Sequence, residues 1–229
     1  MTQASPTRTA LFLLIAIVVL EGPVRMLMAT DPWLVDGDHW YFVQPLRLML
    51  EIAFVLAAGS ALWRAGYGRL MFHRLERRHW IPLLVFGGLI IALFAFGRTE
   101  VWTPLVVPGV IGGAILWFMT GMFIGIGQEL TFRGLLFTSL GAYLSRPWVW
   151  AVSIVVFAVA PLHSYRMVIF ALDGREGRAA FLALVYIIAG VLFTWLRART
   201  QSLLVPALIH ALVNGLTFAV TFTLVASAG

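Results

Sequence analysis

The chain has 229 residues, of which 61% are hydrophobic and only 11% are charged. Soluble domains contain about 45–50% apolar and about 25% charged residues, so this composition excludes an ordinary soluble protein and indicates an integral membrane protein. The absence of cysteine excludes disulfides, thiolate metal sites and a cysteine nucleophile. The formal charge of +6 comes entirely from arginine, since there is no lysine, and in a membrane protein such an excess indicates orienting loops rather than nucleic-acid binding.

Seven apolar runs are long enough to span a bilayer, whose hydrocarbon core of about 30 Å requires about 20 residues per helix. They cover residues 9–30, 41–64, 80–97, 104–142, 147–165, 179–197 and 202–226. The fourth run is too long for one span, and a division at Gly112 and Gly113 would give eight spans. We therefore predict an all-α, polytopic membrane helical bundle of seven or eight transmembrane helices.

Charged residues between the runs predict an orientation. Residues 64–79 carry five arginines, whereas residues 31–38 carry three aspartates and no arginine. By the positive-inside rule the N-terminus lies in the cytoplasm and, with seven spans, the C-terminus lies outside. A division of the fourth run would invert the helices after it. The first run starts like a signal peptide, but no small-x-small cleavage site follows, so we expect a retained helix.

Two pairs of opposite charges lie inside the early runs. Glu21 precedes Arg25 by four residues, and Arg47 precedes Glu51 by the same spacing. Four residues are just over one helical turn, so the members of each pair can meet on one face. An ionisable side chain at the bilayer centre costs about 2.5–3.5 kcal/mol, so we interpret both as mutually neutralised pairs that face the bundle interior.

A second group of polar residues lies in the later runs. The segment "GIGQELTFRGLLF" (residues 125–137) places an amide, an acid and a guanidinium in an apolar run, and "APLHSY" and "PALIHALVN" add two histidines and an asparagine. Burying these groups without a purpose is costly, so we predict a shared polar site rather than separate structural hydrogen bonds. Its members are Gln128, Glu129, Arg133, His163, His210 and Asn214.

The residue types in this group restrict the chemistry of the predicted site. The sequence has no Gly-x-Ser-x-Gly serine motif and no His-Glu-x-x-His zinc motif. A zinc site on His163, His210 and Glu129 stays an alternative, but Arg133 competes for that carboxylate, and we expect no metal and no other cofactor. The remaining scheme is water activation by a carboxylate, with imidazole and amide donors for an oxyanion. Peptide-bond hydrolysis within the membrane fits this set best.

These segments resemble a known family. "QELTFRGLLF" is similar to the Glu-Glu-x-x-x-Arg motif of the CPBP family, the type II CAAX prenyl endopeptidases and bacteriocin-processing proteins. "GVLFTWLRARTQSLLVPALIHALVN" is similar to its last motif region, with Thr-x-Ser-Leu ahead of His-x-x-x-Asn, and "FAVAPLHS" is a looser match to its Phe-x-x-x-His. The resemblance covers about residues 115–220. It implies a CPBP-like intramembrane peptidase domain over residues 101–229, preceded by N-terminal transmembrane helices over residues 1–100.

The resemblance also implies roles for the polar residues, as in a glutamate-type intramembrane endopeptidase. Position 128 would be the water-activating base, and His163 would help to hold that water. His210 and Asn214 would form the oxyanion hole. The spacing of the last two residues agrees with this role, because residues four apart share one face of a helix.

Glu129 and Arg133 would orient the motif helix, and their spacing of four residues allows them to pair. The chain departs from the family pattern at Gln128, because a neutral amide cannot accept a proton from water at pH 7. Three interpretations stay open: a deliberately silenced protease that keeps its shape, a naturally inactive relative, and an active enzyme in which Glu129 is the base. The charge of Arg133 opposes the third, since it should lower the basicity of Glu129.

A second departure concerns His163. Val159, not phenylalanine, stands four residues before it, and the nearest phenylalanine is Phe157. Pro161 lies between Phe157 and His163 and should bend the helix there. The placement of His163 therefore depends on the geometry of this bend.

A break in a helix is also required by the distance between two of the motifs. In a seven-span arrangement Glu129 lies toward the cytoplasmic end of its run, whereas His163 lies near the outer end of the next. They can meet only if a helix is broken or the fourth run divides. We therefore predict a discontinuity near Gly112, Gly113 or Pro161, where membrane helices tolerate glycine and proline.

These features together predict a multi-pass integral membrane protein of a bacterial cytoplasmic (inner) membrane. We expect it to cleave a membrane-anchored protein or peptide near its C-terminus, in a copy impaired by Gln128. Its expected partners are that substrate and the lipid bilayer, with no nucleic acid. One rival is a non-catalytic membrane factor that binds such a segment, which Gln128 favours over a working enzyme. A small proton-coupled transporter is a weaker rival, because the sequence shows no internal repeat.

Overall fold

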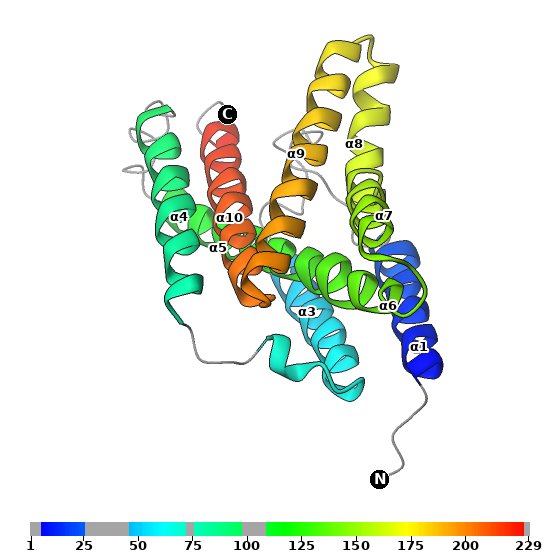
Figure 1. Cartoon of the computed structure of the whole chain (residues 1–229). Helices are drawn as coiled ribbons and strands as arrows, with labels where there is room; N and C mark the ends of the chain where they lie inside the picture. The colour runs from blue at the N-terminus through cyan, green and yellow to red at the C-terminus, as the bar shows by residue number, and fades with distance from the viewer. Residues whose placement is uncertain (1–5, 26–45, 72–75, 98–108, 227–229) are drawn as a thin grey trace. The chain divides into compact units, whose positions relative to one another are not determined.

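The computed structural model of the chain describes residues 6–25, 46–71, 76–97 and 109–226 (Figure 1). These residues are helical or lie in short turns, and no β-strand occurs among them, which confirms the predicted all-α class. The elements are α1 (Pro6–Val19), η1 (Leu20–Val24), α3 (Leu46–Arg64), η3 (Gly68–Leu70), α4 (Arg77–Gly97), α5 (Val110–Glu129), η6 (Leu130–Leu136), α6 (Phe137–Leu140), α7 (Arg146–Ala158), α8 (Pro161–Leu172), α9 (Glu176–Thr200) and α10 (Leu204–Ala226).

Six helical stretches within the described residues are long and apolar enough to cross a membrane. They are Thr7–Val24, Leu46–Arg64, Arg77–Gly97, Val110–Leu140, Glu176–Thr200 and Leu204–Leu224. The bent pair α7–α8 meets the same criterion when its two helices are taken together. If this pair is one broken span, each predicted apolar run corresponds to one span. The eight-span alternative required a break at Gly112 and Gly113. Both residues instead lie in the first turn of the continuous 31-residue stretch that begins at Val110.

The chain divides into two compact units that are interleaved in sequence. Unit 1 consists of Met1–Ala29, Ala57–His73 and Glu129–Pro206, and unit 2 of Thr30–Leu56, Arg74–Gln128 and Ala207–Gly229. Three continuous helical stretches, α3, α5–η6 and α10, pass from one unit into the other. The predicted boundary at residues 100 and 101 lies outside the described residues, and so do Asp31, Asp36 and Asp38 of the acidic loop used for the predicted orientation.

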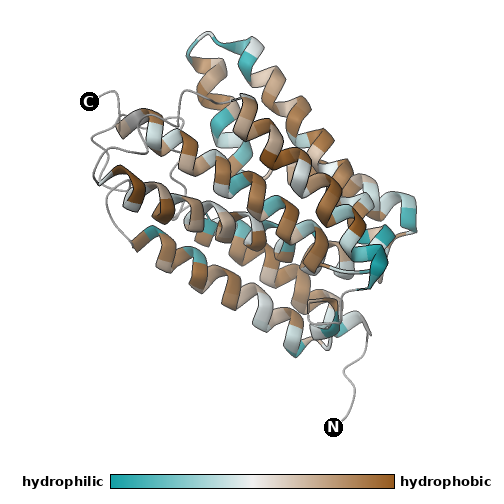
Figure 2. Cartoon of the chain, turned by 90° about the vertical axis from the view of Figure 1, so that its left-hand side faces the viewer, coloured by the Kyte–Doolittle hydropathy of each residue, from teal (hydrophilic) through white to brown (hydrophobic). Residues whose placement is uncertain are grey.

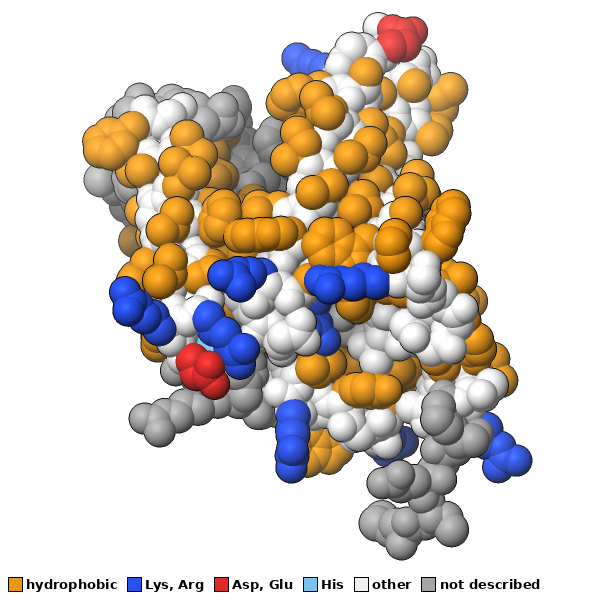
Figure 3. All heavy atoms as spheres, in the orientation of Figure 1, with side chains coloured by type: hydrophobic (Ala, Val, Ile, Leu, Met, Phe, Trp, Pro, Cys, Tyr) orange, Lys and Arg blue, Asp and Glu red, His pale blue; other side chains and the backbone are white. Residues whose placement is uncertain are grey.

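The outward faces of the helices are strongly apolar. Leu84 and Phe96 on α4 are 70% and 83% exposed, and Leu172 at the end of α8 is 79% exposed. Hydrophobic residues predominate along the helices (Figure 2), and their side chains cover the surfaces of α4, α8 and α9 (Figure 3). Contiguous apolar surface of this extent is suited to lipid rather than water. The surface therefore supports an integral membrane protein.

Unit 1 contains the predicted helix break. α7 and α8 meet at a bend of 52°, with Pro161 as the first residue of α8. Proline fits this position because its missing N–H would have no helical partner there, and it keeps Ala160 in an extended conformation (ψ 151). α9 then returns along both helices (Figure 1), with Gly190 against Ile154 and Phe157 of α7. The discontinuity predicted at Pro161 is confirmed.

Unit 2 is built around a close approach of α5 and α10. A Cβ atom on Gly121 would lie 2.5 Å from the carbonyl oxygen of Asn214, and one on Gly125 would lie 2.8 Å from the backbone nitrogen of Ala211 and the carbonyl carbon of His210. Glycines four residues apart leave one helix face without side chains, so the two backbones can touch. This contact holds α10 against α5 at His210 and Asn214, the two residues that α10 contributes to the predicted site.

Candidate active site

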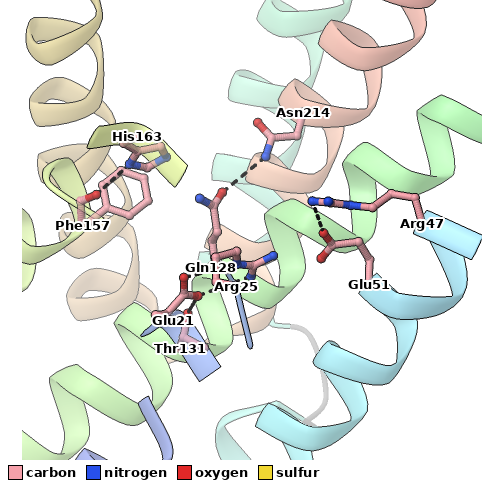
Figure 4. A network of polar contacts seen from close by, with 9 residues as sticks. All are labelled: Glu21, Arg25, Arg47, Glu51, Gln128, Thr131, Phe157, His163 and Asn214. Carbon is pink, nitrogen blue, oxygen red and sulfur yellow. Dashed lines mark hydrogen bonds and ion pairs between the residues drawn. The ribbon is translucent and has the colours of Figure 1, made fainter. Parts of the chain in front are cut away.

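Gln128 and Asn214 are linked by a hydrogen bond within unit 2. The Asn214 Nδ2 group of α10 donates to Gln128 Oε1 of α5 over 3.4 Å, a long bond (Figure 4). Gln128 is buried and Asn214 is partly buried. A glutamate side chain has nearly the same shape as glutamine, and its carboxylate would accept the same hydrogen bond. Position 128 is therefore directed at the asparagine of the last motif.

His210 lies on the same stretch of α10. It precedes Asn214 by four residues, so both side chains project from one face of that helix. The His210 side chain is only 5% exposed, and its backbone packs against Gly125 of α5. Unit 2 thus brings three of the six predicted residues, Gln128, His210 and Asn214, onto adjoining stretches of two tightly packed helices.

Glu129 and Arg133 form an ion pair within unit 1. Arg133 Nη1 lies 3.2 Å from Glu129 Oε1, and both side chains are completely buried. Arg133 Nη2 donates to the carbonyl oxygen of Gly190 over 3.1 Å, and the guanidinium lies 4.1 Å from the ring centre of Phe157. Arg133 belongs to the π-helical segment η6, a widening of the helix that is frequent at functional sites. The predicted pairing is confirmed.

His163 is held by the same phenylalanine. Its ring meets that of Phe157 edge-on at a centroid distance of 4.7 Å, and its Nδ1 lies 2.7 Å from the Phe157 carbonyl oxygen. A carbonyl oxygen only accepts, so Nδ1 carries the proton, and in a neutral ring Nε2 is the basic nitrogen. Phe157 therefore supplies the aromatic contact from six residues upstream, across the break at Pro161. In unit 1, Arg133 and His163 thus contact this ring, and Glu129 is linked to it through its ion pair with Arg133.

Two residues that the sequence did not single out support His163. The ring of Tyr186, from α9, stacks on the imidazole at a centroid distance of 3.9 Å and an interplanar angle of 14°. Arg166 Nη1 in turn donates to the Tyr186 hydroxyl over 3.0 Å. The spacing of three residues between His163 and Arg166 was visible in the sequence. The contribution of Tyr186 was not, because it depends on the packing of α8 against α9.

The two early charge pairs are structural, as predicted. Arg25 Nε lies 3.3 Å from Glu21 Oε2, and Thr131 donates to Glu21 Oε1 over 2.7 Å, all within unit 1. Arg47 Nη2 lies 2.7 Å from Glu51 Oε1 within unit 2. All four charged side chains are buried (Figure 4). Each glutamate is thus neutralised by an arginine of its own helix.

The described part of the chain contains no ligand set for the zinc alternative. Within residues 6–25, 46–71, 76–97 and 109–226, no three histidine or acidic side chains are close enough together to hold a metal ion. Glu129, the acid of that alternative, has Arg133 as its ion-pair partner.

Comparison with known families identifies the region that carries these residues. Residues 110–216 match the family described as Type II CAAX prenyl endopeptidase Rce1-like. No curated protein and no solved structure matches the chain. The match agrees with the resemblance noted over about residues 115–220, and it includes all six predicted site residues.

Proposed function

We propose that the chain is a glutamate-type intramembrane endopeptidase with its base position occupied by Gln128, on the premise that residues 110–216 match the Type II CAAX prenyl endopeptidase Rce1-like family. The observation that carries the proposal is the contact between Gln128 and Asn214. A side chain at position 128 is directed at an amide donor of the last motif. A carboxylate there would lie beside the group proposed to stabilise the reaction's oxyanion.

In the proposed reaction, a water molecule attacks the scissile carbonyl carbon. The base at position 128 removes a proton from that water, and negative charge develops on the carbonyl oxygen. Asn214 and His210 donate hydrogen bonds to this oxyanion. When the carbon–nitrogen bond breaks, the base returns its proton to the leaving amine. The neutral Nε2 of His163 fits an acceptor that helps to orient the water.

Glu129 is a poor substitute for the base. Its carboxylate is neutralised by Arg133, and the same guanidinium is fixed by the Gly190 carbonyl and the Phe157 ring. Releasing the carboxylate to accept a proton would leave a buried arginine without its anion, which is unfavourable. We assign Glu129 and Arg133 to holding η6 in place rather than to proton transfer.

The chain with Gln128 therefore lacks the carboxylate that would remove a proton from water. Glutamine keeps the shape of glutamate and accepts the hydrogen bond from Asn214, but it is not a base. A deliberately silenced protease and a naturally inactive relative both fit this arrangement. A second function, a membrane factor that binds a substrate segment without cutting it, is favoured by the same observation, since position 128 keeps its contact with Asn214 but carries no base.

The proposed substrate is a membrane-anchored protein or peptide cut near its C-terminus. Membrane anchoring follows from the location of the site, because its residues lie on helices long and apolar enough to span a bilayer. We place the protein in a bacterial cytoplasmic membrane, as a CPBP-like domain over residues 101–229 preceded by helices over residues 1–100.

The test is hydrolysis by the Gln128→Glu variant in proteoliposomes that contain a panel of membrane-anchored peptides, lipidated and unlipidated. Mass spectrometry should detect a released C-terminal fragment, and in water labelled with heavy oxygen the new carboxyl group should carry one labelled atom. Gln128→Ala is the matched control and should release nothing. If Gln128→Glu cleaves no peptide while the parent protein binds one, the endopeptidase proposal fails and the binding function replaces it.

A further inference from the structure

One buried arginine in unit 1 differs from all others in the described chain. Arg197, near the C-terminal end of α9, is only 7% exposed. Within the described residues no carboxylate lies at ion-pair distance from its guanidinium, and its Nε has no hydrogen-bond partner. The other buried arginines each pair with a glutamate four residues away: Arg25, Arg47 and Arg133.

The contacts that Arg197 does make are weak for a buried cation. Its guanidinium lies 5.9 Å from the ring centre of Phe137 on α6, near the limit of a cation–π interaction. The C-terminal end of α9 also favours a positive charge, but only modestly. Neither interaction offsets the removal of an unpaired cation from water. A bound anion would provide the missing compensation.

Other unused hydrogen-bond donors lie on the elements around Arg197. The hydroxyl of Thr138, next to Phe137, and that of Thr194, one turn before Arg197, are both buried without a partner among the described residues. The same holds for the indole nitrogen of Trp150 on α7. Donors without acceptors are rare inside proteins, and several of them on neighbouring elements indicate an acceptor that is not part of the protein.

The packing of α7 against α9 brings these groups to one end of unit 1. Gly190 of α9 lies against Ile154 of α7, and the two helices run in opposite directions, so the first turns of α7 lie beside the last turns of α9. An open groove of about 460 Å³ at the start of α7 is lined by Arg146, Pro147 and Trp150. The Arg146 guanidinium lies 5.8 Å from the ring centre of Trp150.

This end of unit 1 also has the side chains expected at a membrane–water boundary. α9 ends at Thr200, and Arg199 in its last turn is exposed. Tyr143 and Trp148, beside the start of α7, are exposed aromatic residues. Aromatic and arginine side chains concentrate at the depth of the lipid headgroups. Exposed aromatic and arginine side chains at this end of unit 1 are what a position at the depth of the lipid phosphates would require.

We propose that this end of unit 1 binds one phosphate group, supplied by the headgroup of an anionic phospholipid, with Arg197 as its main ligand. A planar guanidinium matches the unesterified oxygens of a phosphate with two parallel hydrogen bonds. Arg146 contributes charge from the adjoining groove. Inorganic phosphate has the same chemistry, but the boundary position of the site makes a lipid its natural source.

The experiment is native mass spectrometry of the full chain in detergent, titrated separately with phosphatidylglycerol, with a neutral diacylglycerol and with inorganic phosphate. The variants are Arg197→Gln and Arg197→Lys, and the matched control is Arg199→Gln, which removes the same charge from an exposed position in the same helix turn. Circular dichroism and size-exclusion chromatography establish that each variant is folded.

We expect the parent to retain phosphatidylglycerol over diacylglycerol. Arg197→Gln should weaken that retention by about 10-fold or more, the loss expected for one hydrogen bond between charged groups. Arg199→Gln should change it by less than about 2-fold, as for an exposed charge. The loss of retention in Arg197→Lys should lie between the losses in Arg197→Gln and Arg199→Gln, because lysine keeps the charge without the planar guanidinium.

Two results would overturn the proposal. One is that the parent retains both phosphatidylglycerol and diacylglycerol, and to the same extent, a comparison that does not depend on the folding of any variant. The other is equal loss in Arg197→Gln and Arg199→Gln, which would indicate attraction by surface charge alone. Binding of inorganic phosphate without retention of lipid would support the phosphate site and assign its source to the free anion.

Discussion

The polar residues of unit 1 and those of unit 2 are held in place by different forces. In unit 1, Glu129, Arg133 and His163 are fixed by an ion pair, a backbone carbonyl and stacked aromatic rings. In unit 2, Gln128 and Asn214 share one long hydrogen bond between neutral amides, and their helices are positioned by glycine contacts. The charged group is therefore held by several strong contacts, whereas the contact between the two neutral amides is long and weak.

This difference separates two residues that are adjacent in the sequence. Gln128 and Glu129 differ by about 100° around one helix, so each meets different neighbours. The glutamate that is present is committed to Arg133, and the position that would act as a base holds an amide. The adjacency of the two residues alone does not show which is structural. The partners that each side chain contacts in the folded chain show which of the two is structural.

The largest effect is expected from removing the charge in unit 1. Arg133→Ala leaves Glu129 buried without its cation, which typically costs about 3–5 kcal/mol. Thermal unfolding in detergent should show a large decrease in stability, together with a lower yield of monodisperse protein. Arg199→Ala is the control, because Arg199 is exposed, and should be close to the parent. A stable Arg133→Ala protein would mean that the ion pair does not hold η6.

The second largest effect is expected on the cleavage rate when a proposed oxyanion donor of unit 2 is removed. In a Gln128→Glu background, Asn214→Ala or His210→Ala should lower the cleavage rate about 10²–10³-fold, as does the loss of an oxyanion donor elsewhere. Folded yield should change little, in contrast to Arg133→Ala. Gln201→Ala, which removes an exposed amide at the C-terminal end of α9, is the control. Unchanged turnover in both donor variants would remove the pair from the mechanism.

The glycine contact provides a third test. Gly125→Ala places a methyl group 2.8 Å from the α10 backbone, and overpacking of this kind costs about 1–3 kcal/mol. The same change at Gly88 on α4, where nothing lies within 4 Å, should not destabilise the fold. Unfolding temperatures of the two variants provide the comparison. Equal temperatures would show that α5 and α10 are free to separate.

The smallest effect is expected at Tyr186. Its stacking on His163 should contribute about 0.5–1.5 kcal/mol, the range for aromatic pairs. In the Gln128→Glu background, Tyr186→Leu should therefore reduce turnover by about 10-fold at most. Tyr186→Phe keeps the stack and loses only the hydrogen bond from Arg166, so it should retain more activity. If Tyr186→Leu retained more activity than Tyr186→Phe, the hydroxyl group and not the stacked ring would be what supports His163.

The span pattern and the charge pairs were predictable from the sequence because both depend on local regularities. Apolar runs of sufficient length give spans, and a spacing of four residues gives Glu129–Arg133, Glu21–Arg25 and Arg47–Glu51. Pro161 likewise marked the helix break. Each of these features is set by residues within one continuous stretch of the chain.

The remaining features depend on packing between helices. The pairing of His163 with Phe157 depends on the geometry of the helix break. These two residues are six apart, two more than in the family pattern Phe-x-x-x-His, and the break accommodates the two additional residues. The stacking of Tyr186 required α9 to return along α8. Gly121 and Gly125 form a small-residue pair that is visible in the sequence, but their partner helix is not. The unpaired state of Arg197 is a property of the folded chain alone.

The central claim is that position 128, and not Glu129, is the base position of this site. It is tested most directly by the cleavage rate of one matched substrate with the parent, Gln128→Glu, Glu129→Gln and the double variant, measured side by side. We predict that Gln128→Glu exceeds the parent by about 10²–10⁴-fold, the range of a general base. A parent that cleaves as fast as Gln128→Glu, and loses that activity in Glu129→Gln, would contradict the claim and make Glu129 the base.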